Sequence, residues 1–365
     1  MKKLSFFDKI IFFLNTLSAL VLAVSLLVPY VSTKLISSLS VVSLIVPFTV
    51  IINLIFVFYW LLKRKRNFLL SGTLLLLWYL LLGPFYQFSN GNDDSDIDNE
   101  KSFSIMSFNA RSFNELKQLE DDDIEDQIYE FVSQQNPDFV CFQETLYAMK
   151  VNDALNQYEY KFVDFIYGKH RGKVIQSIYS KYPIINIDSI TFPNSFNNAI
   201  YADILFKKDT VRIYNLHLQS FRIVPGLNTI QNGESSKLFE RSRNVMLKQY
   251  EQARLIREDM DETNYKKIVV GDFNNTQYSN VYQVIKGDMK DSYVEKGRSF
   301  GRTYDLLKFP IRIDYILADP DFEVLSHKNF DERLSDHYPV MATLRLTLVN
   351  SPAYLQKCGL LMLSR

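Results

Sequence analysis

The chain has 365 residues, which is enough for a membrane region followed by one large globular domain. Its basic and acidic side chains number 41 each, and a formal net charge of +0 weighs against a processive DNA binder, which needs a basic surface. Only two cysteines and four histidines occur, so the composition excludes a disulfide framework and disfavours a binuclear zinc site.

Three uncharged apolar stretches open the chain, at residues 10–33, 35–62 and 67–92. Each is longer than the roughly 20 residues that a helix needs to cross a bilayer core. A cleaved signal peptide does not account for three such stretches, and all of them lack the polar face of a soluble bundle helix. We therefore expect residues 1–90 to form a membrane region with three transmembrane helices.

Positive charges predict the orientation of this region. Lys2, Lys3 and Lys9 precede the first stretch, and the KRKR run at 63–66 lies between the second and the third, whereas only Lys34 separates the first two. Lys and Arg concentrate on the cytoplasmic loops of membrane proteins. The N-terminus is therefore expected in the cytoplasm and the rest of the chain outside it, in the periplasm if the source is a Gram-negative bacterium.

The rest of the chain is expected to hold one globular domain, over 102–347, between an acidic linker and an unassigned tail. The linker, 91–101, is polar and acidic, which is typical of a short tether. The tail covers 348–365. Short β-type runs alternate with helical patterns at 115–135 and 235–260, and this mixture predicts an α/β domain of two packed sheets with helices outside.

Polar side chains follow or interrupt apolar, strand-like runs at six places in this domain. Asp272 and Asn274 are two residues apart after such a run, so on a strand they point the same way. Asp314 stands inside a strand-like run, where a buried carboxylate requires a partner. A carboxylate, an amide and an imidazole brought together by a sheet suit metal-assisted attack of water on phosphorus. In chain order the motifs are SFN at 107–109, QE at 143–144, NLHL at 215–218, GDFN at 271–274, RIDY at 312–315 and SDH at 335–337.

This ordered set of motifs resembles the endonuclease/exonuclease/phosphatase superfamily, which has the fold of DNase I, abasic-site endonucleases, neutral sphingomyelinases and inositol-polyphosphate 5-phosphatases. The resemblance extends over residues 102–347 and points to a membrane-anchored bacterial type. It implies an α/β fold, a four-layer DNase I-like sandwich of two mixed β-sheets flanked by helices, preceded here by the three transmembrane helices. It also implies a hydrolase that acts on phosphate esters with Mg²⁺, or alternatively Mn²⁺, as its cofactor.

The resemblance assigns the metal site to Glu144, with Asn109 completing or orienting it and Asp336 in support. Hard divalent cations prefer carboxylate oxygens and retain several waters. Some nucleases of the family carry Asp two residues after the first Asn, where this chain has Arg111. A guanidinium in place of that carboxylate disfavours a second metal and offers a phosphate ligand, although a salt bridge at the surface is an equal alternative. The further substrate-binding candidates are Asn215 and Tyr304.

The resemblance also assigns the catalytic residues. Asp272 would position or deprotonate the attacking water, and Asn274 would bind a phosphoryl oxygen. His337 is expected near the scissile phosphate, with Asp314 hydrogen-bonded to its ring and holding its tautomer. Either Asp272 or His337 can serve as the general base. His217 matches a second imidazole, which stabilises the developing charge or protonates the leaving oxygen.

The favoured interpretation is a membrane-anchored, Mg²⁺-dependent phosphoesterase that hydrolyses a phosphodiester or phosphomonoester outside the cytoplasm. The substrate is a lipid, a small molecule or a nucleic acid, and no protein partner is expected. One alternative is an extracytoplasmic nuclease acting on DNA or RNA, which favours a basic cleft and stacking aromatic side chains. A second alternative is a catalytically inactive, membrane-tethered binding module, whose motif residues should have decayed; none of the six motifs has lost its main polar group.

Overall fold

The computed structural model of the protein describes residues 4–84, 86–88, 101–115, 117, 119–121, 123–145, 155–164, 174–221, 235–306 and 309–347. The chain forms two compact units. The helical unit comprises Met1–Phe85, Ser220–Arg254 and Asn275–Ile285, and the sheet unit comprises Tyr86–Gln219, Leu255–Asn274 and Lys286–Arg365. Apart from Lys101, the predicted acidic linker lies outside the described residues, and so does the predicted tail.

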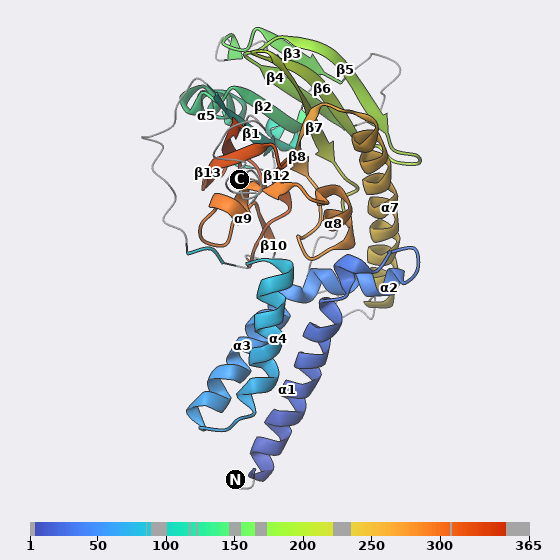
Figure 1. Cartoon of the computed structure of the whole chain (residues 1–365), viewed down its shortest axis with the longest axis vertical. Helices are drawn as coiled ribbons and strands as arrows, with labels where there is room; N and C mark the ends of the chain where they lie inside the picture. The colour runs from blue at the N-terminus through green and yellow to red at the C-terminus, as the bar shows by residue number, and fades with distance from the viewer. Residues whose placement is uncertain are drawn as a thin grey trace, which may run out of the picture. The chain divides into compact units, whose positions relative to one another are not determined.

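Three apolar helices, α1, α3 and α4, pack side by side in the helical unit (Figure 1). The first begins with a capping box, in which Ser5 accepts a hydrogen bond from the backbone of Asp8 and the Asp8 side chain bonds back to Ser5. Short helical turns join the first two long helices. The bounds are α1 Phe6–Ser25, η1 Val28–Tyr30, α2 Ser37–Ser40, η2 Val41–Ile45, α3 Val46–Leu62 and α4 Phe68–Leu82.

Two segments, Phe6–Tyr30 and Ser37–Leu62, are long and apolar enough to cross a membrane. The prediction of a third such span over 67–92 is wrong in its length, because α4 has only 15 residues. It ends where Gly83 adopts a φ of 79° just before Pro84, and neither residue continues a helix readily. A helix of this length spans about 22 Å, which is less than the hydrocarbon core of about 30 Å.

The three helices place polar side chains inside and apolar side chains outside. Asn15 Nδ2 donates to Ser71 Oγ (2.5 Å), and Ser71 Oγ donates to Asn53 Oδ1 (2.7 Å). These three residues are fully buried and join α1, α4 and α3. The outward faces are apolar: the side chains of Phe13, Phe58 and Leu80 are 62%, 63% and 67% exposed. This distribution is the reverse of that in a water-soluble helical bundle.

Part of the predicted globular domain packs with these helices. Tyr278 is 3% exposed and lies in a core cluster with Leu22, Val46, Val50 and Trp78. Two polar side chains from the same segment donate to bundle carbonyls: Asn280 Nδ2 to Pro29 O (2.6 Å) and Thr276 Oγ1 to Ser43 O (3.3 Å). The segment Asn275–Ile285, which contains most of α8 (Asn280–Lys286), therefore belongs to the helical unit.

The sheet unit contains two six-stranded sheets, and both are mixed. In the first sheet β1 and β2 are parallel and the other pairs antiparallel; in the second, β7 and β8 are the parallel pair. The first sheet, in spatial order, is β13 Phe322–Asn329, β14 Val340–Leu346, β1 Ser102–Asn109, β2 Phe139–Thr145, β4 Ile175–Ser180 and β3 Tyr160–Val163. The second is β5 Ile184–Thr191, β6 Asn198–Phe206, β7 Asp209–His217, β8 Lys266–Asp272, β12 Asp314–Ala318 and β9 Lys290–Asp291.

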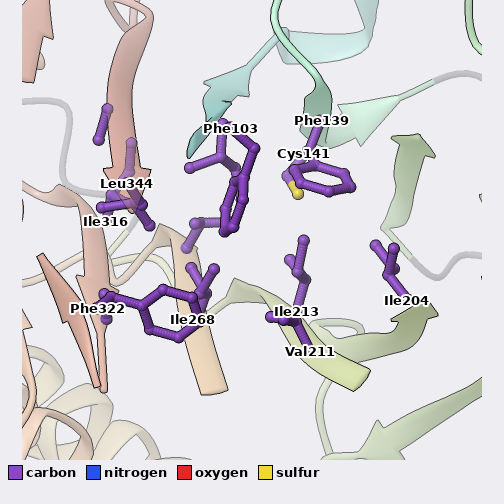
Figure 2. Close-up of a cluster of buried hydrophobic side chains, with 14 of the residues drawn as sticks. Phe103, Phe139, Cys141, Ile204, Val211, Ile213, Ile268, Ile316, Phe322 and Leu344 are labelled. Atoms are coloured by element: carbon purple, nitrogen blue, oxygen red, sulfur yellow. The ribbon is translucent and has the colours of Figure 1, made fainter. Parts of the chain in front are cut away.

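An apolar core fills the space between the two sheets (Figure 2). Phe103 and Phe139 from the first sheet and Ile213 and Ile268 from the second are each at most 2% exposed. A second cluster packs α5 (Ile124–Gln135) on the outer face of the first sheet, through Ile128 and Val132 among others. The expectation of an α/β fold with two mixed sheets is thus confirmed.

The helix expectations are met in part. The predicted helix at 235–260 is α7, Ser235–Glu262. In place of the helix predicted at 115–135, the structure has α5, which begins at Ile124. A short turn, η4 (Arg111–Asn114), has positive φ at all four residues, between 44° and 61°. The described part of the sheet unit also contains two short strands, β10 (Tyr304–Leu306) and β11 (Phe309–Ile311), and the helix α9 (Ser292–Lys296).

Candidate functional site

Strand register brings the predicted polar motifs to one place. His217 and Asp272 are partners at the carboxyl ends of the parallel strands β7 and β8, and Asp314 on β12 is the antiparallel partner of Asp272. In the first sheet Asn109 and Gln143 are partners near the ends of the parallel strands β1 and β2, and Glu144 directly follows Gln143. The carboxyl ends of both parallel pairs therefore supply the site.

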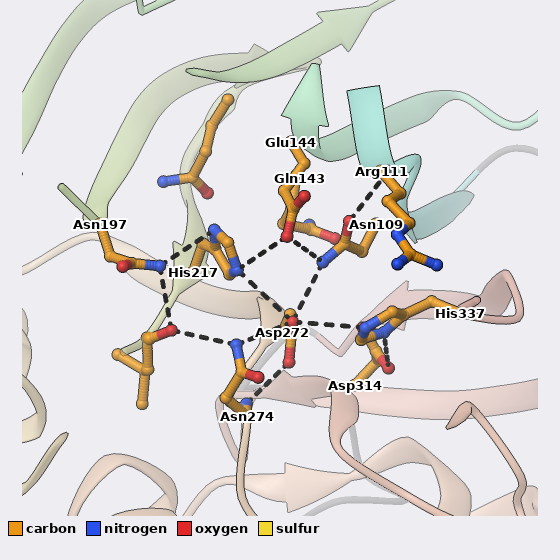
Figure 3. Close-up of polar contacts among 12 residues, drawn as sticks. Asn109, Arg111, Gln143, Glu144, Asn197, His217, Asp272, Asn274, Asp314 and His337 are labelled. Carbon is orange, nitrogen blue, oxygen red and sulfur yellow. Dashed lines mark hydrogen bonds and ion pairs between the residues drawn. The ribbon is translucent and has the colours of Figure 1, made fainter. Parts of the chain in front are cut away.

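Asn109 bridges the two sheets at this site (Figure 3). Its Nδ2 lies 3.3 Å from Oε1 of Glu144 and 3.1 Å from Oδ2 of Asp272, and it donates to both. The amide oxygen accepts from the backbone N of Arg111 (3.1 Å), which fixes which end of the amide faces the carboxylates. Asn109 therefore orients the two carboxylates through its NH₂ group.

Asp272 is the most heavily bonded carboxylate of the site. It accepts from the backbone N of Asn274 (2.7 Å) and from Nδ2 of Asn274 (3.0 Å), in addition to Asn109. The same Asn274 Nδ2 donates to the carbonyl of Leu218 (3.0 Å). Burial raises the pKa of Asp272 to about 8, although the neighbouring His337 and these donors act in the opposite direction.

His217 points a buried nitrogen at both carboxylates. Its Nε2 lies 3.5 Å from Oε1 of Glu144 and 3.6 Å from Oδ2 of Asp272, and it makes no hydrogen bond within the described part of the chain. Asn197 Nδ2, which also donates to the Leu218 carbonyl (3.1 Å), lies 3.2 Å from Nδ1. Since Nδ1 accepts from that amide, the neutral ring carries its proton on Nε2. Burial lowers the pKa of His217, which favours this neutral form.

His337 and Asp314 form a buried pair. His337 Nδ1 lies 3.0 Å and 3.2 Å from the two carboxylate oxygens of Asp314, and His337 Nε2 lies 3.8 Å from Oδ2 of Asp272. Burial alone would lower the pKa of His337, but Asp314 and Asp272 raise it to about 10. The partner expected for Asp314 is thus His337, whereas the neighbouring Arg312 pairs with Asp291 (2.7 Å).

Arg111 and Asp336 pair with each other at the edge of the site. Arg111 Nη1 lies 3.0 Å from Oδ2 of Asp336, and both side chains are partly exposed. The ring of Tyr304 lies 5.0 Å from the ring of His337, centroid to centroid, and the two residues form a β-bridge. Arg111 and Tyr304, proposed to contact substrate, therefore lie near the catalytic candidates, and Asp336 is held by a protein cation.

Three site residues have left-handed backbones: Arg111 has φ 44°, Glu144 φ 51° and Asn274 φ 48°. A non-glycine residue costs free energy in this region, and such residues cluster where a side chain must point in one direction. At Glu144 the register between β2 and β4 shifts, which leaves the carboxylate outside the regular pairing. The strained backbone turns these three side chains out of the sheets and into the site.

Asn215 lies deeper than the other candidates. It is fully buried; its Nδ2 donates to the carbonyls of Phe142 (2.9 Å) and Ser177 (3.0 Å), and its Oδ1 accepts from Gln143 Nε2 (2.6 Å). These bonds tie β7 to β2 and β4 beneath the site. Asn215 thus holds the strands together, and the structure does not bring it to the carboxylates with the other candidates.

Two carboxylate groupings are available to a cation. Asp272, Asp314 and His337 have ligand atoms within 4.8 Å of one another and are all buried. In that group both ring nitrogens of His337 already face carboxylates, Nδ1 at 3.0 Å from Asp314 and Nε2 at 3.8 Å from Asp272. Glu144 and Asp272 instead direct oxygens at the same amide nitrogen, and Glu144 is partly open to solvent. Carboxylate oxygens that are partly accessible fit a hard cation that keeps several waters.

The endonuclease/exonuclease/phosphatase family matches residues 106–337, and a domain of unknown function (DUF8431) matches residues 8–85. No curated protein matches the chain.

Several solved structures share the fold. D. rerio TDP2 complexed with single strand DNA product has a TM-score of 0.52 and 17% identity, over 67% of this chain and 99% of that one. A family protein from Bacteroides thetaiotaomicron has a TM-score of 0.51 and 18% identity, over 68% and 98%. Another from Bacteroides vulgatus has a TM-score of 0.50 and 20% identity, over 67% and 99%. The family match covers more than half of the chain, which therefore belongs to the endonuclease/exonuclease/phosphatase family.

Proposed function

We propose that the protein is a membrane-anchored, Mg²⁺-dependent phosphoesterase that hydrolyses a phosphodiester or phosphomonoester by in-line attack of water. The observation that carries the proposal is the meeting of Asn109, His217 and His337 around one carboxylate oxygen, Oδ2 of Asp272, with Glu144 bonded to the same Asn109 amide. Acid, base and metal-ligating groups converge at one point, as metal-assisted hydrolysis requires.

Glu144 would hold the ion, with Asp272 beside it and Asn109 orienting both carboxylates. When bound, Mg²⁺ would act as a Lewis acid that stabilises negative charge on the phosphoryl group. Asp336 is better understood as the partner of Arg111 than as a second ligand site, because a guanidinium 3.0 Å away already neutralises it. We therefore favour one metal and assign Arg111 to a phosphate oxygen of the substrate.

Asp272 is the better candidate for the general base. His337 is held in its protonated form by two carboxylates, so it has no free nitrogen lone pair to accept a proton from water. Burial raises the pKa of Asp272, so its ionised form is a stronger base toward the attacking water than an ordinary carboxylate. The attacking water would form the new phosphorus–oxygen bond and give its proton to Asp272 as the bond to the leaving oxygen breaks.

The two imidazoles and Asn274 would stabilise the charge that develops on the phosphoryl oxygens. His217 offers its Nε2–H, and His337 offers a positive charge kept in place by Asp314. Tyr304 packs on the ring of His337, where it would also contact the substrate. Asn215 would act from below, by holding β7 in register.

Insertion in a membrane is supported by the apolar outer faces of α1, α3 and α4. We infer that α4 inserts with the two longer helices, because Ser71 on α4 bonds to buried Asn15 and Asn53. A helix shorter than the bilayer core is accommodated by local thinning of the bilayer. Three inserted helices, with the KRKR turn in the cytoplasm, would place the sheet unit outside the cytoplasm. A phospholipid or a small phosphate ester then fits better than a nucleic acid, since the tether concentrates the enzyme at the membrane.

The test uses the full chain in lipid nanodiscs with Mg²⁺ and five substrates: plasmid DNA, RNA, sphingomyelin, phosphoinositides and sugar phosphates. One class should be cleaved, and Asp272→Asn should abolish that cleavage. The matched control is Asp188→Asn, on the exposed face of β5, which should retain it. Cleavage of DNA or RNA alone would establish the nuclease alternative. If no substrate is cleaved, or if Asp272→Asn does not change the cleavage, the proposed active site is wrong and the catalytically inactive binding module is the better interpretation.

A further inference from the structure

The chain enters the sheet unit immediately after α4. Gln87 and Ser299 exchange two backbone hydrogen bonds, Gln87 N to Ser299 O (2.9 Å) and Ser299 N to Gln87 O (2.8 Å). The Gln87 side chain adds a third bond, from Nε2 to the carbonyl of Val294 (2.8 Å). Residues 86–88 are therefore attached to the sheet unit before the acidic segment begins.

This attachment gathers three aromatic side chains on the surface. The rings of Tyr86 and Phe88 are 4.8 Å apart, and those of Tyr86 and Phe300 are 4.9 Å apart. Tyr86 is 38%, Phe88 87% and Phe300 40% exposed, so the cluster faces outward. Arg298 is exposed two residues before Phe300. We name Tyr86, Phe88 and Phe300 the aromatic foot.

The length of the connection limits where the foot can be. The last residue of α4 is Leu82, and Tyr86 follows four residues later. Four residues of fully extended chain span at most about 14 Å. The headgroup layer on each side of a bilayer core is about 5–8 Å thick. With α4 inserted, the foot therefore lies at or within a few ångströms of the headgroup layer, whatever the orientation of the sheet unit.

We propose that the aromatic foot inserts into the headgroup region of the bilayer that holds the helices, and so holds the sheet unit at the membrane surface. Aromatic side chains are enriched at this depth, where an apolar ring meets a polar environment. Exposed Arg298 is placed to pair with lipid phosphates. The proposal rests on the membrane insertion proposed above. It assigns the foot to a lipid surface rather than to stacking on nucleobases or to contact with a second copy of the chain.

Site-directed spin labelling of the full chain can test the proposal in phosphatidylcholine–phosphatidylglycerol vesicles. The background carries Cys358→Ser, because Cys141 is buried and does not react readily. Labels at Phe88→Cys and Phe300→Cys report on the foot, and Phe88 is so exposed that its replacement disturbs little packing. The matched control is Ile187→Cys, an exposed apolar position on β5 of the same unit, 47% exposed. A label at Leu80→Cys, on the outer face of α4, reports on insertion itself.

The foot labels should lose access to a water-soluble relaxation agent and gain access to oxygen, as the Leu80 label should, while the Ile187 label stays accessible to the water-soluble agent. If the Leu80 label is buried in lipid but both foot labels behave like Ile187, the foot proposal is wrong and the anchoring stands. If the Leu80 label is itself in water, the membrane anchoring fails first. Protection of the foot labels only when DNA is added, or only at high protein density, would assign the foot to nucleic acid or to a second copy and overturn the proposal.

Discussion

The guanidinium of Arg111 lies 3.0 Å from the carboxylate of Asp336, so the protein supplies its own cation at the edge of the site. The left-handed turn at Arg111–Asn114 directs that side chain, since a regular strand continuation would carry it away from Asn109. Under the proposed function this pair favours one metal over two, because Asp336 meets a guanidinium where a second ion would need a ligand.

Replacing Arg111 with Gln should therefore raise KM by about 10- to 100-fold, the usual effect of losing a charged hydrogen bond to phosphate, with a smaller change in kcat. Asp336→Asn is the control, because it leaves Arg111 in place and free to bind substrate. Mg²⁺ titrations of both variants give the measurement. A higher Mg²⁺ requirement in Asp336→Asn, with KM unchanged in Arg111→Gln, would instead support a second metal.

The His337–Asp314 pair predicts a shifted pH profile. Asp314 and Asp272 raise the pKa of His337 to about 10, so the ring keeps its proton through neutral pH. Asp314→Asn removes one of these charges, and the pKa of His337 should fall toward its ordinary value of about 6.5. Since the proton is lost as pH rises through the pKa, the alkaline limb of kcat/KM should move to lower pH. An unchanged limb means that some other group controls it.

His337→Ala should reduce turnover by roughly 10²–10⁴-fold, the range for a lost acid–base group. Adding Asp314→Asn to it should cost little more, because residues that act as a unit are not additive. The double-mutant cycle is measured as kcat/KM at saturating Mg²⁺. Full additivity would show that Asp314 works apart from His337.

Glu144→Gln tests the metal assignment. A carboxamide binds Mg²⁺ more weakly than a carboxylate, so activity and apparent Mg²⁺ affinity should fall together, and excess Mg²⁺ should restore part of the activity. His337→Ala is the comparison, since added metal should restore nothing there. Equal behaviour of the two variants across a Mg²⁺ titration would remove Glu144 from the metal site.

His327, outside the site, predicts a pH-dependent stability. Its Nδ1 accepts from Ser292 Oγ (2.8 Å), its Nε2 donates to Asn329 Oδ1 (3.2 Å), and burial lowers its pKa to about 4. The unfolded ring has a pKa of about 6.5. Between these values the unfolded chain binds more protons, so this contribution to stability is complete above about pH 6.5 and is lost progressively as pH falls toward 4.

Thermal unfolding of the detergent-solubilised chain at pH 7.5 and pH 5.5 measures this loss. His327→Gln should have a lower Tm at pH 7.5 and a smaller drop between the two pH values than the wild type. Carboxylates that titrate in the same range affect both proteins alike. If the Tm of the two proteins falls equally between pH 7.5 and pH 5.5, His327 does not contribute to the pH dependence of stability.

The number of membrane crossings decides where catalysis takes place. With α1, α3 and α4 all inserted, a reporter enzyme that is active only outside the cytoplasm should be active when fused after Gln87 and silent when fused at Lys65. With α4 lying outside the bilayer core, both fusions should be silent. Activity at Lys65 alone would mean that the whole topology is inverted.

The sequence predicted the two packed sheets from its strand-like runs and helical patterns. The grouping of Asn109, Glu144, Asp272 and His337 was predicted by the resemblance of the ordered motifs to a known family. The sequence did not predict which side chains from distant segments contact each other. Asn197, immediately before β6, orients His217, whereas its neighbour Asn198 bonds to Asp164. The pairing of Arg111 with Asp336 depends on a left-handed turn in non-glycine residues, for which local sequence carries no clear signal.

The junction between Asn274 and Asn275 has a practical consequence. Asn274 contacts Asp272 in the site, and the next residue opens a segment whose Tyr278 is packed among Leu22, Val46 and Trp78. A shortened protein that begins after α4 would not fold as a self-contained domain, because residues 275–285 belong to the helical unit. Removing the helices would expose the apolar ring of Tyr278, four residues after Asn274 in the chain. The shortened protein should therefore aggregate or lose activity even though its site residues are unchanged. Assays and crystallisation are therefore best designed around the intact polypeptide in detergent or lipid.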